Sequence, residues 1–319
     1  MSLGEFDLIA KYFTRRVTRA ALGVGDDCAL FATSPGMQLA VSSDMLVEGR
    51  HFLPTVPADR LGHKALAVNL SDLAACGARP LAFTLALALP RVDEPLLEGF
   101  ARGLLALADA HECELIGGDT TQGPFNICIT VFGEVPVGQA LLRSGARAGD
   151  DLYVSGTLGD ARLALEAFRG TVALDGAALE STRLAMEQPQ PRIALGLALR
   201  GVATSAIDVS DGLLGDLGHV LRRSNIGAEV WADALPRSDA LRAQPFEWQR
   251  TCTLAGGDDY ELVFTAPPAR AAQVTEAARF AQVSVTCIGR IHGEPGLRVL
   301  DRDHQPITTV FGSFDHFKS

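Results

Sequence analysis

Three oxygen-bearing side chains interrupt an apolar stretch early in the chain. Ser42, Ser43 and Asp44 follow residues 39–41, at a point where a buried strand would continue with apolar residues. Hydroxyl and carboxylate oxygens gathered in one tight group suit a hard divalent cation such as Mg²⁺. The sequence therefore predicts a cation site at this strand, and we expect the rest of the molecule to be organised around it.

Further carboxylates end apolar segments elsewhere in the chain. Asp27 follows a turn with two glycines, and Asp119 follows a Gly-Gly pair after a predicted strand. Asp208 and Asp211 flank a predicted strand-to-helix junction, where helix capping by Ser210 or Asp211 explains one polar residue but not both acids. Each turn alone is ordinary. Their repetition leads us to expect that these acids converge on one pocket.

A predicted helix over residues 57–76 carries Asn69 and Asp72 three positions apart on one narrow face. Apolar residues occur on nearly every side of this helix, which indicates burial. An unpaired ionised carboxylate is costly to bury, so Asp72 should meet a cation. That cation is either a metal ion, which we favour, or Lys64, which lies eight residues earlier on about the same face.

The length of 319 residues exceeds the usual size of one hydrophobic core, so we expect two domains, at residues 1–140 and 141–319. Helices and strands do not follow the regular spacing of a doubly wound parallel sheet. The predicted class is therefore α+β, with two mixed α/β sandwich domains. Strands are predicted at residues 28–32, 81–89, 125–135, 151–155, 203–209, 283–288 and 297–300, and helices at 6–13, 57–76, 95–112, 160–168, 177–188, 192–200 and 269–280.

The charge balance restricts the class of partner. Lys and Arg number 28 against 38 Asp and Glu, and no basic run is present, so no nucleic-acid partner is expected. The six cysteines are scattered without a Cys-x-x-Cys pair, which is typical of reduced thiols. The N-terminus lacks the features of a signal peptide, and the most apolar run, residues 81–89, is too short to cross a bilayer. We expect a cytoplasmic enzyme without a membrane partner.

The motifs taken together resemble those of a known family. In chain order they read GEFDLI, GVGDDC, SSDMLVEGRHF, KALAVNLSDLAACGARP, LIGGDTT, LRSGARAGD, DVSDGL and GGDDYELVF. From residue 4 to the C-terminus, this series resembles thiamine-monophosphate kinases, of the superfamily that includes aminoimidazole ribonucleotide synthetase. The resemblance implies ATP-dependent phosphorylation of thiamine phosphate to thiamine diphosphate, with ATP and Mg²⁺ bound near the junction of a homodimer. It also implies that the N-terminal sheets of two subunits close into a barrel.

The resemblance also assigns roles to the residues at the matching motifs. The catalytic residues it implies are Asp44, Asp72, Arg143 and Asp211. ATP would bind near Gly118, Asp119, Arg143 and Ser210, and thiamine phosphate near His51, Asp258 and Phe314. The metal ligands it implies are Asp27, Ser42, Ser43, Asp44, Asp72, Asp119, Asp208 and Asp211.

The chemistry of these residue types agrees with phosphoryl transfer. Two polyanions must meet, so neutralising charge is the main demand, and Mg²⁺ held by carboxylates meets it. An acceptor phosphate with a second pKa of about 6 is mostly dianionic at neutral pH and needs no general base. His51 then serves either as a hydrogen-bond donor to the substrate, which we favour, or as a strand-end histidine with a backbone partner.

Two alternative functions remain open at this point. A relative from the same superfamily could act on a different acceptor, and a non-catalytic protein could bind divalent cations or nucleotides with the same acidic turns. Release of ADP that depends on both Mg²⁺ and thiamine phosphate distinguishes the kinase from both.

Overall fold

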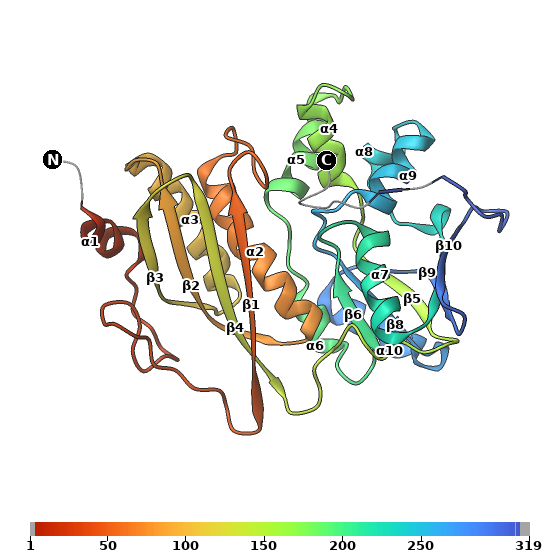
Figure 1. Cartoon of the computed structure of the whole chain (residues 1–319), viewed down its shortest axis with the longest axis horizontal. Helices are drawn as coiled ribbons and strands as arrows, with labels where there is room; N and C mark the ends of the chain where they lie inside the picture. Colours follow the sequence, from red (N-terminus) through yellow and green to blue (C-terminus); the bar gives the residue numbers. More distant parts are fainter. Residues whose placement is uncertain (1–3, 310, 313–319) are drawn as a thin grey trace. The chain divides into compact units, whose positions relative to one another are not determined.

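The computed structural model describes residues 4–309 and 311–312. Its contacts divide the chain into two compact units. The first contains the residues up to Leu73 together with Ala78–Gly138, and the second contains Ala74–Gly77 together with the residues from Gln139 onward. Each unit has its own sheet and its own core (Figure 1).

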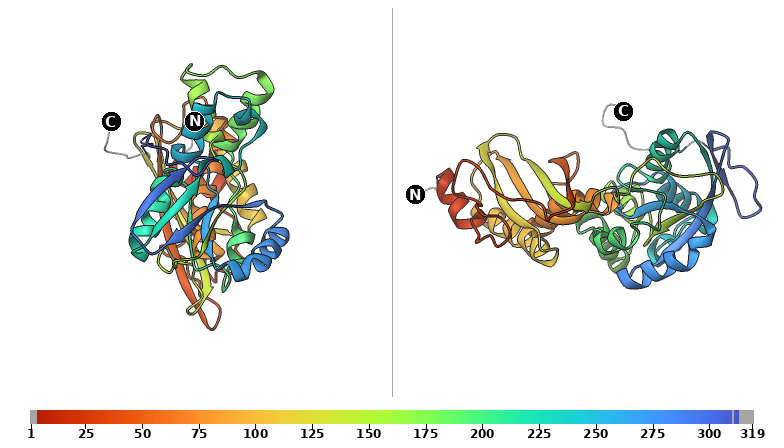
Figure 2. Two further views of the ribbon diagram at one scale, coloured as in Figure 1. Left: turned by 90° about the vertical axis from the view of Figure 1, so that its right-hand side faces the viewer. Right: turned by 90° about the horizontal axis from the view of Figure 1, so that it is seen from below.

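The first unit is built on a four-stranded mixed sheet in the order β1-β4-β2-β3, in which only the β2–β3 pair is parallel. Helices α2 and α3 cover one face of this sheet (Figures 1 and 2). Leu66 and Leu70 of α2 and Leu97 and Leu104 of α3 are completely buried, so the core lies between these helices and the sheet. The elements are α1 (Glu5–Leu8), the π-helix η1 (Ile9–Phe13), β1 (Met37–Val47), α2 (Ala58–Cys76), β2 (Arg79–Leu89), α3 (Glu94–Ala110), β3 (Glu114–Gln122) and β4 (Asn126–Pro136).

The other face of this sheet carries no helix of the described residues. Alternate residues of β1 point to this face, and Leu39, Val41 and Met45 are 48%, 55% and 54% exposed. Residues 17–31 cover only one end of the face, where Phe31 packs edge-on against Phe132 with ring centroids 5.3 Å apart. The uncovered part of the face is therefore apolar and open.

The second unit contains a six-stranded mixed sheet in the order β10-β7-β9-β5-β8-β6, with a single parallel pair, β10–β7. The apolar side of α7 packs against this sheet, with Leu213 and Leu217 buried on Val154 and Ile207. The elements are β5 (Asp151–Ser155), α4 (Asp160–Phe168), α5 (Gly176–Glu187), α6 (Ile193–Ala198), β6 (Ser205–Asp208), α7 (Leu213–Ser224), β7 (Gly227–Trp231), η2 (Ala232–Ala234), α8 (Asp239–Arg242), α9 (Phe246–Ala255), β8 (Leu262–Ala266), η3 (Pro268–Arg270), α10 (Ala271–Ala281), β9 (Val285–His292) and β10 (Gly296–Leu300).

The predicted α+β class with mixed sheets is confirmed, whereas one local prediction is wrong. Residues 28–32 form no strand, only an isolated bridge between Leu30 and Leu22, because Ala29 and Phe31 pack onto the sheet instead of pairing with a strand. Ser42, Ser43 and Asp44 break the apolar run but lie within one continuous strand, since β1 continues to Val47.

Among the residues that the structure describes, no helix combines the length and the apolar composition that crossing a bilayer requires.

Candidate active site

The first group of site residues lies where α2 packs against β1. The Ser42 hydroxyl donates to the Asp72 carboxylate at 2.5 Å, and the Asp44 N–H donates to Asn69 Oδ1 at 3.0 Å. Asn69 and Asp72 therefore share the helix face that their spacing predicted. Asp72 is only half-buried, although the helix around it is buried as expected. The hydrogen bond from Ser42 holds the Asp72 carboxylate against β1, the strand that also carries the candidate ligands Ser43 and Asp44.

Ser43 lies on the opposite face of β1. Its hydroxyl contacts the Thr130 hydroxyl at 3.0 Å and the carbonyl of Ile129 at 3.1 Å. Because side chains alternate along a strand, Ser42 and Asp44 share one face and Ser43 takes the other. The three oxygen-bearing side chains therefore do not form a single group.

His51 lies just after β1, in a tight connection. Its Nδ1 accepts a hydrogen bond from the Val47 N–H at 2.9 Å. In the neutral ring this places the proton on Nε2, which makes Nε2 a donor. The backbone partner considered for this histidine is therefore present, and the same contact orients a donor on the far side of the ring.

The second group surrounds a cavity of about 660 Å³ beside β3. Asp27 and Asp119 are exposed and line it together with Gly118. Gly118 has φ of 150°, and a Cβ there would meet the Leu85 carbonyl oxygen at 1.8 Å. Only glycine permits this approach of β3 to β2, which sets the position of Asp119.

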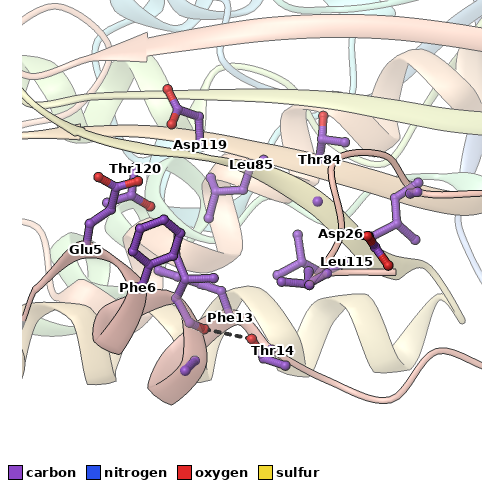
Figure 3. Close-up of a pocket in the computed structure, with 18 of the residues that line it drawn as sticks. Glu5, Phe6, Phe13, Thr14, Asp26, Thr84, Leu85, Leu115, Asp119 and Thr120 are labelled. Carbon is purple, nitrogen blue, oxygen red and sulfur yellow. Dashed lines mark hydrogen bonds between the residues drawn. The ribbon is translucent and has the colours of Figure 1, made fainter. Parts of the chain in front are cut away.

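An apolar wall closes the other side of this cavity (Figure 3). It is formed by residues of α1, η1 and β3, including Phe6, Phe13 and Leu115, and Glu5 also faces the opening. The sequence predicted this N-terminal helix but not its place at the cavity. The structure leaves Phe6 82% exposed at this cavity, and nothing in the sequence pattern indicates that position.

Asp44 and Asp119 lie on the two edge strands of the sheet, one residue out of register, because the row of Asp44 ends at Gly118. Three strand spacings separate them, which corresponds to about 14 Å. One metal ion cannot bind both carboxylates within a single unit. Ligands at these two positions would belong to different ions, or to different parts of a long polyanion.

The third group lies in the second unit, at the junction of β6 and α7. Asp208 is 4% exposed at the end of β6, while the Ser210 side chain is exposed in the turn that follows. Asp216 Oδ2 accepts hydrogen bonds from the N–H groups of Ser210, Asp211 and Gly212 at 3.1, 3.0 and 3.1 Å. Burial raises the pKa of Asp216 to about 7, and the nearby Asp211 charge adds to the rise. The sequence analysis did not identify this residue.

The loop at residues 256–260 packs against the same turn. The Asp258 N–H donates to the Ser210 carbonyl at 2.8 Å, and the Tyr260 N–H donates to the Val209 carbonyl at 2.8 Å. Asp258 and Tyr260 have φ of 61° and 54°, a left-handed conformation that is costly outside glycine. These contacts bring the backbone of Asp258 beside Ser210.

The side chain of Asp259 is directed at the start of α4. Its Oδ1 accepts the Gly159 N–H at 2.9 Å, and its Oδ2 is buried without a hydrogen-bond partner among the described residues. Burial raises the pKa of Asp259 well above its ordinary value. This carboxyl group anchors the loop that carries Asp258.

Arg143 is exposed, and its backbone carbonyl accepts from the Ser224 hydroxyl at 3.3 Å. Partial burial lowers the pKa of His219 on α7, the charges of Arg222 and Arg143 lower it further, and Asp211 opposes them. The charges of Arg143 and Asp211 therefore both affect the pKa of His219. This histidine was also missed, because nothing in its sequence context distinguishes it from a surface residue.

The donor set fits Mg²⁺ bound with an open coordination shell. Within the described part of the chain, no three His, Cys, Asp or Glu side chains converge as a ready-made metal site. Mg²⁺ normally takes one or two carboxylates and completes its shell with water and substrate phosphates. The paired oxygens at Ser42 and Asp72, and the carboxylates at the cavity, fit that open type of site. Phe314 lies outside the described residues.

Comparison with known proteins shows which families the chain resembles. The models of AIR synthase related proteins match the chain, the N-terminal domain at residues 25–135 and the C-terminal domain at residues 147–302. The thiamine-monophosphate kinase of Salmonella typhimurium is 46% identical over 99% of both chains. The crystal structure of that kinase from Stenotrophomonas maltophilia K279a has a TM-score of 0.84 and 48% identity, covering 88% of this chain and 91% of that one. AaThiL complexed with AMPPCP and TMP has a TM-score of 0.78 and 29% identity, covering 90% and 89%.

Proposed function

The chain belongs to the thiamine-monophosphate kinase family, and we propose that it transfers the γ-phosphoryl group of ATP to thiamine phosphate, giving thiamine diphosphate. The observation that carries the proposal is the likeness, over 90% of the chain, to AaThiL bound to AMPPCP and TMP. The described residues add carboxylate and hydroxyl oxygens of the kind that hold the cations such a reaction needs.

The cavity beside β3 is the proposed binding site for ATP in the first unit. Its acidic side, with Asp27 and Asp119, suits phosphates that carry Mg²⁺, and its apolar wall at Phe6 and Phe13 suits a planar base. Gly118 lets the backbone come close to the ligand. Arg143 and Ser210 are the proposed ATP contacts of the second unit.

Mg²⁺ is the proposed cofactor, and when bound it would neutralise charge on the phosphates and orient them. The residues proposed to hold it are Asp27, Ser42, Ser43, Asp44, Asp72, Asp119, Asp208 and Asp211. The Ser42 hydroxyl restrains the Asp72 carboxylate, and Asn69 restrains the backbone of Asp44. Because Ser43 lies on the other face of β1, its contribution would be to a separate ion or to a water-mediated contact.

The acceptor phosphate needs orientation more than deprotonation, because it is already mostly dianionic. His51 donates from Nε2 while Val47 holds the ring at Nδ1. The backbone of Asp258 is held beside Ser210, and its carboxylate is proposed to pair with the cationic thiazolium of thiamine. Phe314 is also proposed to contact thiamine phosphate.

We also propose that the protein works as a homodimer, with the first units joined through the open face of their sheets into a closed barrel. The support is the apolar exposure of Leu39, Val41 and Met45 on a face that no described helix covers.

The function is tested by measuring ADP release from purified protein with ATP and Mg²⁺. ADP should appear only after thiamine phosphate is added, and thiamine diphosphate should form in equal amount. ADP release with a different phosphate acceptor only would favour a superfamily relative of other specificity. Nucleotide binding without any turnover would favour the non-catalytic alternative.

A further inference from the structure

The turn before α7 has the backbone of an anion-binding site, but a side chain of the protein already fills it. Consecutive N–H groups at a glycine-containing helix N-terminus commonly receive a phosphate. Here the N–H groups of Ser210, Asp211 and Gly212 all donate to one oxygen of Asp216, at 3.0 to 3.1 Å. Asp216 is 3% exposed, so this acceptor belongs to the interior.

The internal acceptor determines which groups the turn presents outward. With the three N–H groups directed at Asp216, the Ser210 side chain is exposed and that of Asp211 is half-buried. Gly212 permits the bend with φ of 115°, and a Cβ there would lie 3.0 Å from the backbone of Ala255. The turn thus offers oxygen acceptors to a ligand, which suits a cation and repels a bare phosphate.

We propose that Asp216 is a positioning residue for the metal ligands of the second unit: its carboxylate occupies the amide nest before α7, and thereby orients Asp211 and Ser210 for a divalent cation. The proposal rests on the proposed function, in which Asp208 and Asp211 hold Mg²⁺. It goes beyond that function by assigning the orientation of these ligands to a residue that touches neither ATP nor thiamine phosphate.

The test measures cation binding without turnover. Mn²⁺ binding to the full-length protein, in the absence of nucleotide, is followed by the electron paramagnetic resonance signal of free Mn²⁺. Asp216→Ala should weaken Mn²⁺ binding by about tenfold, because the acceptor that orients Asp211 and Ser210 is lost. Asp216→Asn keeps one oxygen acceptor, so it should weaken binding about threefold.

A kinetic measurement separates orientation from a general structural effect. In the same variants, the Mg²⁺ concentration for half-maximal rate should rise by the same factors, while the KM for thiamine phosphate stays within about twofold. The matched control is Asp150→Asn. Asp150 is also 3% exposed in this unit and accepts from the Arg147 N–H and the Thr204 hydroxyl, at 2.9 and 2.6 Å. Its variant should bind Mn²⁺ like the wild type.

The outcomes are distinct. Wild-type Mn²⁺ affinity in Asp216→Ala overturns the proposal. If the alanine variant fails to fold, a tenfold loss in Asp216→Asn overturns it, because that variant keeps the oxygen acceptor. An equal loss in the Asp150 control also overturns it. A wild-type protein that binds Mn²⁺ but phosphorylates nothing would instead remove the proposed function. Wild-type turnover together with unchanged binding in the variants removes the present proposal alone.

Discussion

Asp72 accepts a hydrogen bond from the Ser42 hydroxyl at 2.5 Å. It lies on α2, and the buried core residues of that helix do not depend on it. Asp72→Asn keeps the size of the side chain and can still accept this hydrogen bond, but it loses the charge that a cation needs. Activity should fall by about a hundredfold or more. The free energy of unfolding should change by less than about 1 kcal/mol, since the residue is half-buried.

Steady-state turnover and chemical denaturation of the same preparations provide the measurement. Asp93→Asn is the control, because Asp93 caps α3 through the Leu96 N–H at 3.2 Å and asparagine caps a helix equally well. Full turnover of Asp72→Asn at ordinary Mg²⁺ would remove this residue from the proposed ligands. The same test applies to Asp44→Asn.

Asp259 gives a prediction about pH. Its pKa is raised by burial, so the folded protein holds a proton that the unfolded chain releases above about pH 4. Stability from this group is therefore complete at low pH and decreases as pH rises toward the folded pKa. Asparagine is neutral in both states and should lack this dependence. Urea denaturation from pH 5 to 8 should show Asp259→Asn gaining stability relative to the wild type as pH increases, and parallel curves would contradict the expectation.

At the scale of elements, the approach of β3 to β2 depends on one glycine. A Cβ on Gly118 would lie 1.8 Å from the Leu85 carbonyl oxygen, and φ of 150° is unfavourable for alanine. Gly118→Ala should therefore displace β3 and cost about 2–4 kcal/mol of stability. It should also raise the KM for ATP, because β3 forms part of the cavity wall.

The neighbouring glycine provides the control for stability. A Cβ on Gly117 would meet only Thr84 Cγ2, at 3.9 Å, so Gly117→Ala should change the free energy of unfolding by less than about 0.5 kcal/mol. Equal stability of the two variants in thermal denaturation would show that the close approach at Gly118 is not required.

The elements also show which features the sequence could predict. The spacing of Asn69 and Asp72 was enough to place both on one helix face, because helical geometry is local. Only the structure shows that this face meets β1. Strand β7 and helices α8 and α9 were missed, because short elements in a mixed sheet carry weak periodicity. Asp216 could not be identified from its sequence context. It acts through three backbone N–H groups, and a sequence pattern does not show where backbone groups point.

At the scale of the whole molecule, the uncovered face of the first sheet relates the candidate site to formation of the proposed dimer. Asp44 and Asp119 occupy opposite edges of one sheet, and closing two sheets into a barrel brings those edges against a second copy. The family resemblance predicted the barrel, whereas the apolar alternation of β1 alone, with Leu39, Val41 and Met45, is compatible with any covering partner. Exposure of these side chains in a single chain provides the physical reason for an interface.

Val41→Glu tests this interface, since Val41 is 55% exposed near the middle of β1 and its change should leave the core of the unit intact. Light scattering should give the wild type twice the 33.7 kDa mass of one chain. The variant should be a monomer with activity reduced at least about tenfold, because a charge buried in an apolar interface costs several kcal/mol. Phe280→Glu, at a residue 72% exposed on α10, should remain dimeric and active. A fully active monomer of either the wild type or Val41→Glu would contradict the barrel, because the open face would then have no role in the reaction.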